Sequence, residues 1–165
     1  MFPVTKIVSP PDARMLSQLA EAHARAFASQ DERPWRPEEL LSLMAMPGVS
    51  VRVALDGDKV AGFIMDRVAA DEAELITLAV SPQYQGQKIA LGLMNAMIVD
   101  LLAEKISKVF LEVRDDNERA IKLYEDFGFQ AQGKRPRYYQ TQSGKIIDAL
   151  CLCLILNKHS SGKEN

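Results

Sequence analysis

Apolar and polar positions follow one another along the chain in runs that predict short strands and amphipathic helices. Residues 4–8 form a β-type run, and apolar residues within 16–27 then recur at the spacing of one helix face. Pro37 stands where the first turn of a second, shorter helix would begin, and Pro47-Gly48 would end it. The N-terminal region therefore predicts one strand followed by two helices.

Three more β-type runs come next, over residues 49–55, 59–68 and 74–80. The sequence Asp56-Gly57-Asp58 between the first two runs is typical of a tight hairpin turn. Together these runs predict an antiparallel meander.

The C-terminal half alternates between helical and β-type patterns. The sequence predicts a helix from Ala90 to Leu101, a strand over 108–114, a helix over 117–127, and two strands over 129–140 and 145–156. Antiparallel strands that precede a crossover imply a mixed sheet covered by helices. The expected fold is of the α/β (α+β) class: a mixed, mostly antiparallel twisted sheet of about seven strands flanked by four helices.

Length and composition restrict the class of protein. The chain has 165 residues, of which 47% are hydrophobic and 25% charged, as is typical of one soluble globular domain. We expect this domain to span residues 1–156 and a polar tail to span 157–165.

Charge and hydropathy indicate which partners to expect. The net charge of −2 provides no broad positive field, so direct binding to nucleic acid or to an anionic membrane is not expected. Apolar runs are far shorter than the ~20 residues of a membrane helix, and the N-terminus lacks a signal-like pattern. We therefore expect a cytoplasmic protein, either a monomer or a weak dimer.

Cysteine and histidine are too sparse to predict a metal or redox centre. Cys151 and Cys153 would point to the same face of a strand, which is typical of packing residues. His23 lies in a predicted helix and His159 in the polar tail, far apart in the sequence. The sequence therefore predicts no bound metal.

The segment 78–90 joins a predicted strand to the N-terminus of the most regular predicted helix. Free N–H groups and the helix dipole make such an end suitable for an anion, for example a phosphate. Taken alone this signal is weak, because most segments of this kind are plain connections.

Within this segment, the run Gln85-Gly86-Gln87-Lys88-Ile89-Ala90 resembles the phosphate-binding loop of the GNAT superfamily of acetyl-coenzyme A dependent N-acetyltransferases. The pattern of that family is Gln or Arg, two residues, Gly, one residue, then Gly or Ala. Lys88 stands where the family has its central glycine, and Gly86 lies two positions earlier. A lysine there costs about 1 kcal/mol if its φ is positive, whereas its ammonium can pair with phosphate oxygens.

A longer set of residues lies in the C-terminal half. It comprises Leu111-Glu112-Val113-Arg114, Asn117, Ala120-Ile121, Leu123-Tyr124, Gly128-Phe129, Gly133, Arg135, Tyr138-Tyr139 and Asp148-Ala149. This set resembles one GNAT subfamily, the ribosomal-protein-alanine N-acetyltransferases. The resemblance covers residues 53–154 by motif and most of the chain by the order of its elements.

The resemblance implies a sheet that opens in a V between its fourth and fifth strands, here 74–80 and 108–114, with acetyl-coenzyme A in the opening. In that arrangement the backbone of the fourth strand pairs with the pantetheine amides and the loop holds the pyrophosphate. The coenzyme-binding residues so implied are Leu78, Ala79, Val80, Gln85, Gly86, Gln87, Lys88, Ile89, Ala90, Leu91, Asn117 and Tyr124. Asn117 is also a common helix N-cap, with Asp115 and Asp116 as competing candidates, so both interpretations stay open.

The reaction that the resemblance implies is attack of a neutral amine on a thioester carbonyl. It needs one proton removed from the amine and one delivered to the leaving thiolate. By resemblance, Glu112 is the general base, acting through a water, and Tyr124 is the general acid. From the pattern alone, Glu112 is an outward polar residue of an alternating strand, and Tyr124 is a core residue at helical spacing from Ala120 and Phe127.

The resemblance also implies an acceptor-binding side formed by Trp35, Tyr138, Tyr139 and Asp148. Trp35 is equally a candidate for a hydrophobic plug between helices. Tyr138 and Tyr139 alternate faces in a regular strand, so we expect at most one of them to face the cleft. Asp148 could attract a positive amine, although this chain reads Ile147-Asp148-Ala149 where subfamily members often carry Glu-Asp-Ala.

The sequence thus predicts an N-acetyltransferase with acetyl-coenzyme A as cosubstrate and a protein or peptide N-terminus as acceptor. By resemblance the acceptor is the N-terminal alanine of a small-subunit ribosomal protein. Two alternatives stay open: a GNAT enzyme acting on a small-molecule amine or a lysine side chain, and a noncatalytic coenzyme-binding regulatory domain.

Overall fold

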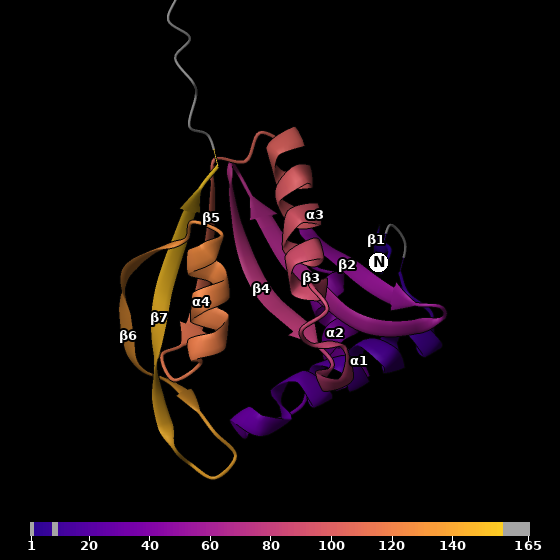
Figure 1. The fold of residues 1–165 in the computed structure, drawn as a ribbon, viewed down its shortest axis with the longest axis horizontal. Coiled ribbons are helices and arrows are strands. Elements are labelled where there is room, and N and C mark those ends of the chain that lie inside the picture. The colour runs from indigo at the N-terminus through magenta and orange to yellow at the C-terminus, as the bar shows by residue number, and fades with distance from the viewer. Residues whose placement is uncertain (1, 8–9, 157–165) are drawn as a thin grey trace, which may run out of the picture.

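The computed structural model describes residues 2–7 and 10–156, and its elements follow the predicted order (Figure 1). They are β1 (Val4–Lys6), α1 (Ala13–Phe27), η1 (Ala28–Gln30), α2 (Pro37–Met44), β2 (Val49–Asp56), β3 (Lys59–Ala69), β4 (Glu72–Val80), η2 (Pro82–Tyr84), α3 (Ile89–Ala103), β5 (Lys108–Arg114), α4 (Glu118–Asp126), β6 (Gln130–Gln140) and β7 (Ile146–Ile155). The end of the first predicted strand at Val8, and the predicted tail over 157–165, lie outside the described residues.

The strands form one seven-stranded sheet in the order β1-β2-β3-β4-β5-β7-β6. Neighbouring strands are antiparallel except β4 and β5, which are parallel. In the described part of the chain, β4 and β5 pair only where residues 72–74 face 108–110, and beyond that point they diverge as the arms of a V (Figure 1). The predicted mixed sheet and its opening are confirmed.

Helices cover both faces of the sheet and form two cores. On one face, α1 and α2 bury Leu19 and Leu40 against Phe63 of β3. On the other face, α3 and α4 bury Leu93, Met97 and Tyr124 against β3, β4 and β5. Each arm of the V is therefore a sheet segment that packs against at least one helix.

Local signals set the ends of several elements. The Asp12 Oδ1 accepts a hydrogen bond from the Met15 N–H at 2.8 Å and begins α1. Asn117 begins α4 in the same way, because its Oδ1 accepts from the Ala120 N–H at 3.2 Å. The N-cap interpretation of Asn117 is therefore correct. Gly57 (φ +57°) forms the predicted hairpin turn between β2 and β3.

The two cysteines are free thiols in β7, as expected. Cys153 is buried, whereas Cys151 is half-buried. Among the described residues, no helix is long and apolar enough to cross a membrane.

A buried ion network ties β2 and β3 to α3. Arg52 is 2% exposed and donates to the Asp66 carboxylate, which is fully buried, and to Asp100 Oδ2 through its Nε at 2.8 Å. Asp66 Oδ2 has no hydrogen-bond partner within the described part of the chain. Arg52 stays charged even when it is buried, and a buried charge without a partner strongly destabilises a fold. Asp66 therefore contributes to stability mainly by pairing with this charge.

We expect the Asp66→Ala variant to lose about 3–5 kcal/mol of unfolding free energy, because Arg52 would stay buried with only Asp100 as partner. Asp100→Asn is the control, since Asp100 is more exposed and its loss leaves the buried Arg52–Asp66 pair intact. Urea unfolding followed by circular dichroism measures both. A loss no larger for Asp66→Ala than for Asp100→Asn would contradict this account.

Candidate active site

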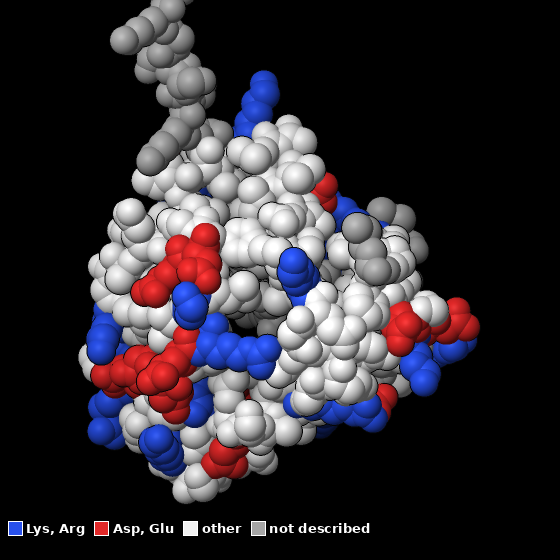
Figure 2. Space-filling model, in the orientation of Figure 1, with Lys and Arg blue, Asp and Glu red and all other residues white. Residues whose placement is uncertain are grey.

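The splay between β4 and β5 contains two adjoining cavities. The larger, of about 350 Å³, lies between the end of β4, the N-terminus of α3 and one side of α4. The smaller, of about 150 Å³, lies between the diverging parts of β4 and β5 and the end of α1. The residues that line both are Phe27, Gln30, Leu78, Asn117, Ala120 and Tyr124. Figure 2 shows the surface hollowed between α3 and α4, with basic side chains at the rim.

The loop before α3 presents backbone N–H groups to the larger cavity. The Gly92 N–H donates to the Lys88 carbonyl at 3.0 Å as the first bond of the helix, so the N–H groups of residues 89–91 have no acceptor within it. Gly86 (φ +77°) and Lys88 (φ +62°) both adopt left-handed conformations. Lys88 therefore carries the positive φ that makes a lysine unfavourable at this position.

Lys88 is exposed and lines the larger cavity together with Arg119. Arg119 donates to the side chain of Gln85, whose Nε2 in turn donates to the Val80 carbonyl at 3.2 Å. The two cations and the N–H groups of the helix end make this rim suitable for phosphate oxygens.

Most of the predicted coenzyme-binding residues line the larger cavity: Leu78, Val80, Gln85, Gly86, Lys88, Ile89, Ala90, Leu91, Asn117 and Tyr124. Ala79 and Gln87 are not among its lining residues. The Ala79 side chain is buried in the core below α1, and the Gln87 Nε2 donates to the Gln83 carbonyl at 3.1 Å. For Ala79, only the backbone is placed to meet a ligand.

Glu112 and Tyr124 both line the smaller cavity. Tyr124 is 6% exposed, and its ring packs edge-on against Phe129 with centroids 5.7 Å apart. Burial strongly raises the pKa of Tyr124, so the phenol keeps its proton at neutral pH. Tyr124 is thus a core residue and a cavity residue at the same time.

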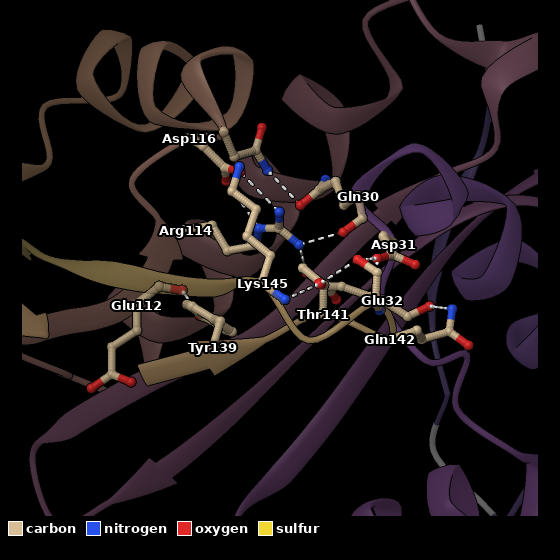
Figure 3. Close-up of polar contacts among 12 residues, drawn as sticks. Gln30, Asp31, Glu32, Glu112, Arg114, Asp116, Tyr139, Thr141, Gln142 and Lys145 are labelled. Carbon is tan, nitrogen blue, oxygen red and sulfur yellow. Dashed lines mark hydrogen bonds and ion pairs between the residues drawn. The ribbon is translucent and has the colours of Figure 1, made fainter. Parts of the chain in front are cut away.

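Two residues of β6, Arg135 and Tyr139, contact Glu112. The Arg135 Nε lies 2.9 Å from Glu112 Oε1. The Tyr139 hydroxyl donates to the Glu112 carbonyl at 3.2 Å (Figure 3). Tyr138 packs edge-on against Tyr139 at 5.0 Å, and the neighbouring Glu112 carboxylate raises the pKa of Tyr138. Tyr139 lines the smaller cavity, whereas Tyr138 is exposed and is not among the residues that line it.

The strand β6 contains a bulge just before these two tyrosines. The pairing of β6 with β7 shifts between Arg135 and Tyr139, and Arg137 within the bulge has a φ of +56°. The Arg137 N–H donates to Asp148 Oδ1 at 2.9 Å. Asp148 thus uses its carboxylate to fix the backbone of β6, and it does so outside the lining of either cavity.

Trp35 lines the smaller cavity and also fills space between helices. Its ring stacks on His23 with centroids 4.3 Å apart and an interplanar angle of 16°, and Phe27 covers His23 at 4.6 Å. Burial lowers the pKa of His23 to about 4, and the Glu39 carboxylate opposes this only in part. His23 is therefore neutral at physiological pH.

Arg114 connects the two arms at the mouth of the smaller cavity (Figure 3). Its guanidinium makes two contacts of 2.9 Å with the Asp116 carboxylate, donates to the Gln30 carbonyl, and lies 3.5 Å from Glu32 Oε1. The turn between β6 and β7 joins the same network, since the Gln142 Nε2 donates to the Glu32 carbonyl at 3.1 Å.

Sequence reasoning assigned no site role to several lining residues, among them Phe27, Gln30, Glu32, Arg114 and Arg119. Arg119 lies in the first turn of α4, where the partial positive charge of the helix N-terminus makes a cation unfavourable. This unfavourable position could have indicated an anionic ligand from the sequence. Glu32 lies in an irregular loop without periodicity, so no pattern pointed to it.

Comparisons with known proteins show the family of this chain. Residues 16–129 match the model of the Acetyltransferase (GNAT) family. The chain is 34% identical over 134 residues to [Ribosomal protein bS18]-alanine N-acetyltransferase of Escherichia coli K12, covering 81% of this chain and 85% of that one.

Solved structures show the same fold. The crystal structure of the ribosomal-protein-S18-alanine N-acetyltransferase from Escherichia coli matches with a TM-score of 0.81 and 28% identity, over 99% of this chain and 100% of that one. Arabidopsis thaliana NAA60 in complex with acetyl-CoA matches with a TM-score of 0.76 over 94% and 99% of the two chains, and its 19% identity supports the fold alone.

Replacing Lys88 by glycine or by alanine separates its charge from its backbone geometry. Both variants lose the ammonium, so both should bind coenzyme A more weakly than the wild type and with a smaller salt dependence. Only alanine keeps a Cβ at the positive φ, so Lys88→Ala should be less stable than Lys88→Gly by about 1 kcal/mol. Calorimetric titration and urea unfolding measure these effects. Equal coenzyme affinity in all three proteins would exclude the ammonium as a phosphate ligand.

The buried His23 should make stability depend on pH. Its folded-state pKa of about 4 lies below the usual 6.5, so its stabilising effect is complete above pH 6.5 and is lost as the pH falls toward 4. The wild type should therefore lose more unfolding free energy than His23→Phe between these pH values, by about 3 kcal/mol. Parallel pH profiles of the two proteins would contradict this expectation.

Proposed function

The chain belongs to the Acetyltransferase (GNAT) family, and we propose that it transfers the acetyl group of acetyl-coenzyme A to the α-amine of a protein N-terminus. The proposed acceptor is the N-terminal alanine of a small-subunit ribosomal protein. The reason is that the Escherichia coli relative with 34% identity is named as a [Ribosomal protein bS18]-alanine N-acetyltransferase. The observation that carries the proposal is that Glu112 and Tyr124 line one small cavity, which adjoins a larger cavity with the features of a phosphate site.

The larger cavity fits the coenzyme. The N–H groups at the start of α3, together with Lys88 and Arg119, would hold phosphate oxygens. The edge of β4 from Leu78 to Val80 faces away from β3 and is not paired with β5 in the described residues, so it would bind the pantetheine amides as a neighbouring strand does. Acetyl-coenzyme A supplies the activated acetyl group as a thioester when bound.

Asn117 would lie beside the pantetheine arm. Its Oδ1 is used as the cap of α4, and its Nδ2 reaches Gln30 Oε1 only at 3.5 Å. The amide N–H groups of Asn117 are therefore the part of this side chain that remains for the coenzyme.

The smaller cavity fits the acetyl transfer step. Glu112 accepts a proton from the acceptor ammonium through a water, and the neutral amine then attacks the thioester carbon. As the carbon–sulfur bond breaks, Tyr124 donates its proton to the sulfur and then takes the second proton released by the amine nitrogen. Burial raises the pKa of Tyr124, so the phenol is protonated and available as a donor when the acceptor amine binds.

The acceptor would enter from the side of β6 and the loop after α1. Trp35 and Tyr139 line the smaller cavity and would contact the first residue of the peptide, whereas Tyr138 is exposed and does not line this cavity. Asp148 would act indirectly by fixing the bulge. An acceptor of ribosomal origin requires this protein in the cytoplasm, so that location is part of the proposal.

We expect Glu112→Gln and Tyr124→Phe each to lower kcat by about 100-fold, because each removes one proton-transfer group. The KM for acetyl-coenzyme A should change little. Release of free thiol in the presence of Ala-initiated peptides measures the rate, and Glu125→Gln, which removes an exposed carboxylate of α4, is the matched control.

The acceptor is tested with peptides that differ only in their first residue and with an N-terminally blocked peptide that contains lysine. Acetylation of the free α-amine alone supports the proposal. Mass spectrometry that places the acetyl group on a lysine ε-nitrogen would favour a different acceptor, and absence of turnover with intact coenzyme binding would exclude the enzyme.

A further inference from the structure

The smaller cavity contains a second carboxylate besides Glu112. Glu32 follows Asp31 in the loop between η1 and α2, and its side chain is 28% exposed. It lines the same cavity as Glu112, Tyr124 and Tyr139. The two acidic side chains come from opposite arms of the V, since Glu32 belongs to the α1 side and Glu112 to β5 (Figure 3).

Glu32 has one ionic partner among the described residues, Arg114, which it shares with Asp116. Arg114 lies 3.5 Å from Glu32 Oε1, while its shorter contacts go to Asp116 and to the Gln30 carbonyl. A carboxylate offers about four acceptor positions, so Glu32 keeps capacity for another donor. Burial raises the pKa of Glu32, and Arg114 opposes this rise. The carboxylate is thus partly desolvated and only partly compensated.

The position of Glu32 is held by the protein before any substrate binds. The Gln142 Nε2 donates to the Glu32 carbonyl at 3.1 Å, and the Gln142 N–H donates to the Asp31 carbonyl at 2.9 Å. The Asp31 carboxylate also accepts from the Ser143 N–H at 3.0 Å. Because these bonds fix the loop against the β6–β7 turn, little ordering is needed when a ligand arrives.

Glu112 is differently placed, because Arg135 already lies 2.9 Å from its carboxylate. An acceptor amine enters as an ammonium with three N–H donors, and it loses water in a cavity of about 150 Å³. A buried cation requires an opposite charge that is free to accept hydrogen bonds. Within the lining of this cavity, Glu32 meets that requirement better than Glu112.

We propose that Glu32 binds the charged α-ammonium of the acceptor before its proton is removed, and so determines the preference of the site for cationic amines. The inference rests on the proposed function. Glu32 is then a substrate-binding residue, and Glu112 is the group that receives the proton.

Asp116 is a matched control for this role. It makes the shorter contacts to the same Arg114, yet it is not among the lining residues of the smaller cavity. If Glu32 served only to neutralise Arg114, Asp116→Asn would have at least the effect of Glu32→Gln. If Glu32 binds the substrate, only the Glu32 variant changes the recognition of the ammonium.

The test compares two peptides of one sequence on the full-length protein saturated with coenzyme A. One peptide begins with alanine and the other with a propionyl group, which has the same carbon skeleton without the ammonium. The wild type should bind the alanine peptide at least tenfold more tightly, as expected for a charge-assisted hydrogen bond. Glu32→Gln should reduce this ratio to about twofold, Glu32→Asp should restore part of it, and Asp116→Asn should leave it unchanged.

Steady-state kinetics add a second readout. Glu32→Gln should raise the acceptor KM about tenfold and leave kcat within about threefold of the wild type, because Glu112 and Tyr124 remain in place. Added salt should weaken binding of the alanine peptide to the wild type and leave binding of the propionyl peptide unchanged. This measurement uses only the wild-type protein, so it does not depend on whether a variant folds.

An unchanged binding ratio in Glu32→Gln, or an equal loss of the ratio in Asp116→Asn, would overturn the role of Glu32. In that case, turnover of the alanine peptide by the wild type would still support the proposed function. If the wild type binds neither peptide and releases no thiol, the proposed function fails and the inference falls with it.

Discussion

The short parallel pairing between β4 and β5 is the constraint on which the rest of the site depends. Only residues 72–74 of β4 pair with 108–110 of β5 in the described structure, while β5 pairs along its whole length with β7. An unpaired strand edge inside a sheet leaves N–H and C=O groups without partners, and such an edge binds another extended chain readily. The opening therefore provides a cavity and, along one side of it, an unpaired strand edge.

Helices pack against each arm of the opening, and the contacts of Arg114 join the two arms. The arm formed by β1 to β4 carries α1 and α2 on one face and α3 on the other, and α4 covers the arm that begins with β5 (Figure 1). Arg114 spans the mouth with contacts to Gln30, Glu32 and Asp116. Because a guanidinium presents five donors in one plane, a single residue can join a loop, a strand end and a turn.

The site combines two environments that a single uniform pocket would not offer. The rim at the start of α3 is cationic and rich in free N–H groups, as phosphates require. The inner cavity is lined by a buried phenol and by two carboxylates, the kinds of group that proton transfer to and from an amine requires. The left-handed Lys88 contributes to the first environment at the cost of an unfavourable backbone conformation.

The order of the helices and strands was readable from the sequence, because periods of 3.6 and 2 residues are local properties. The loop before α3 and the residues Glu112 and Tyr124 were recognised by their resemblance to a family, and they do come together at the splay. The bulge at Arg137 was not readable from the sequence, because it depends on how β6 pairs with β7 and on the hydrogen bond from the Arg137 N–H to Asp148. Glu32 and Arg114 are far apart along the chain, and only the tertiary structure brings them together, since the contact depends on how two arms of the sheet diverge.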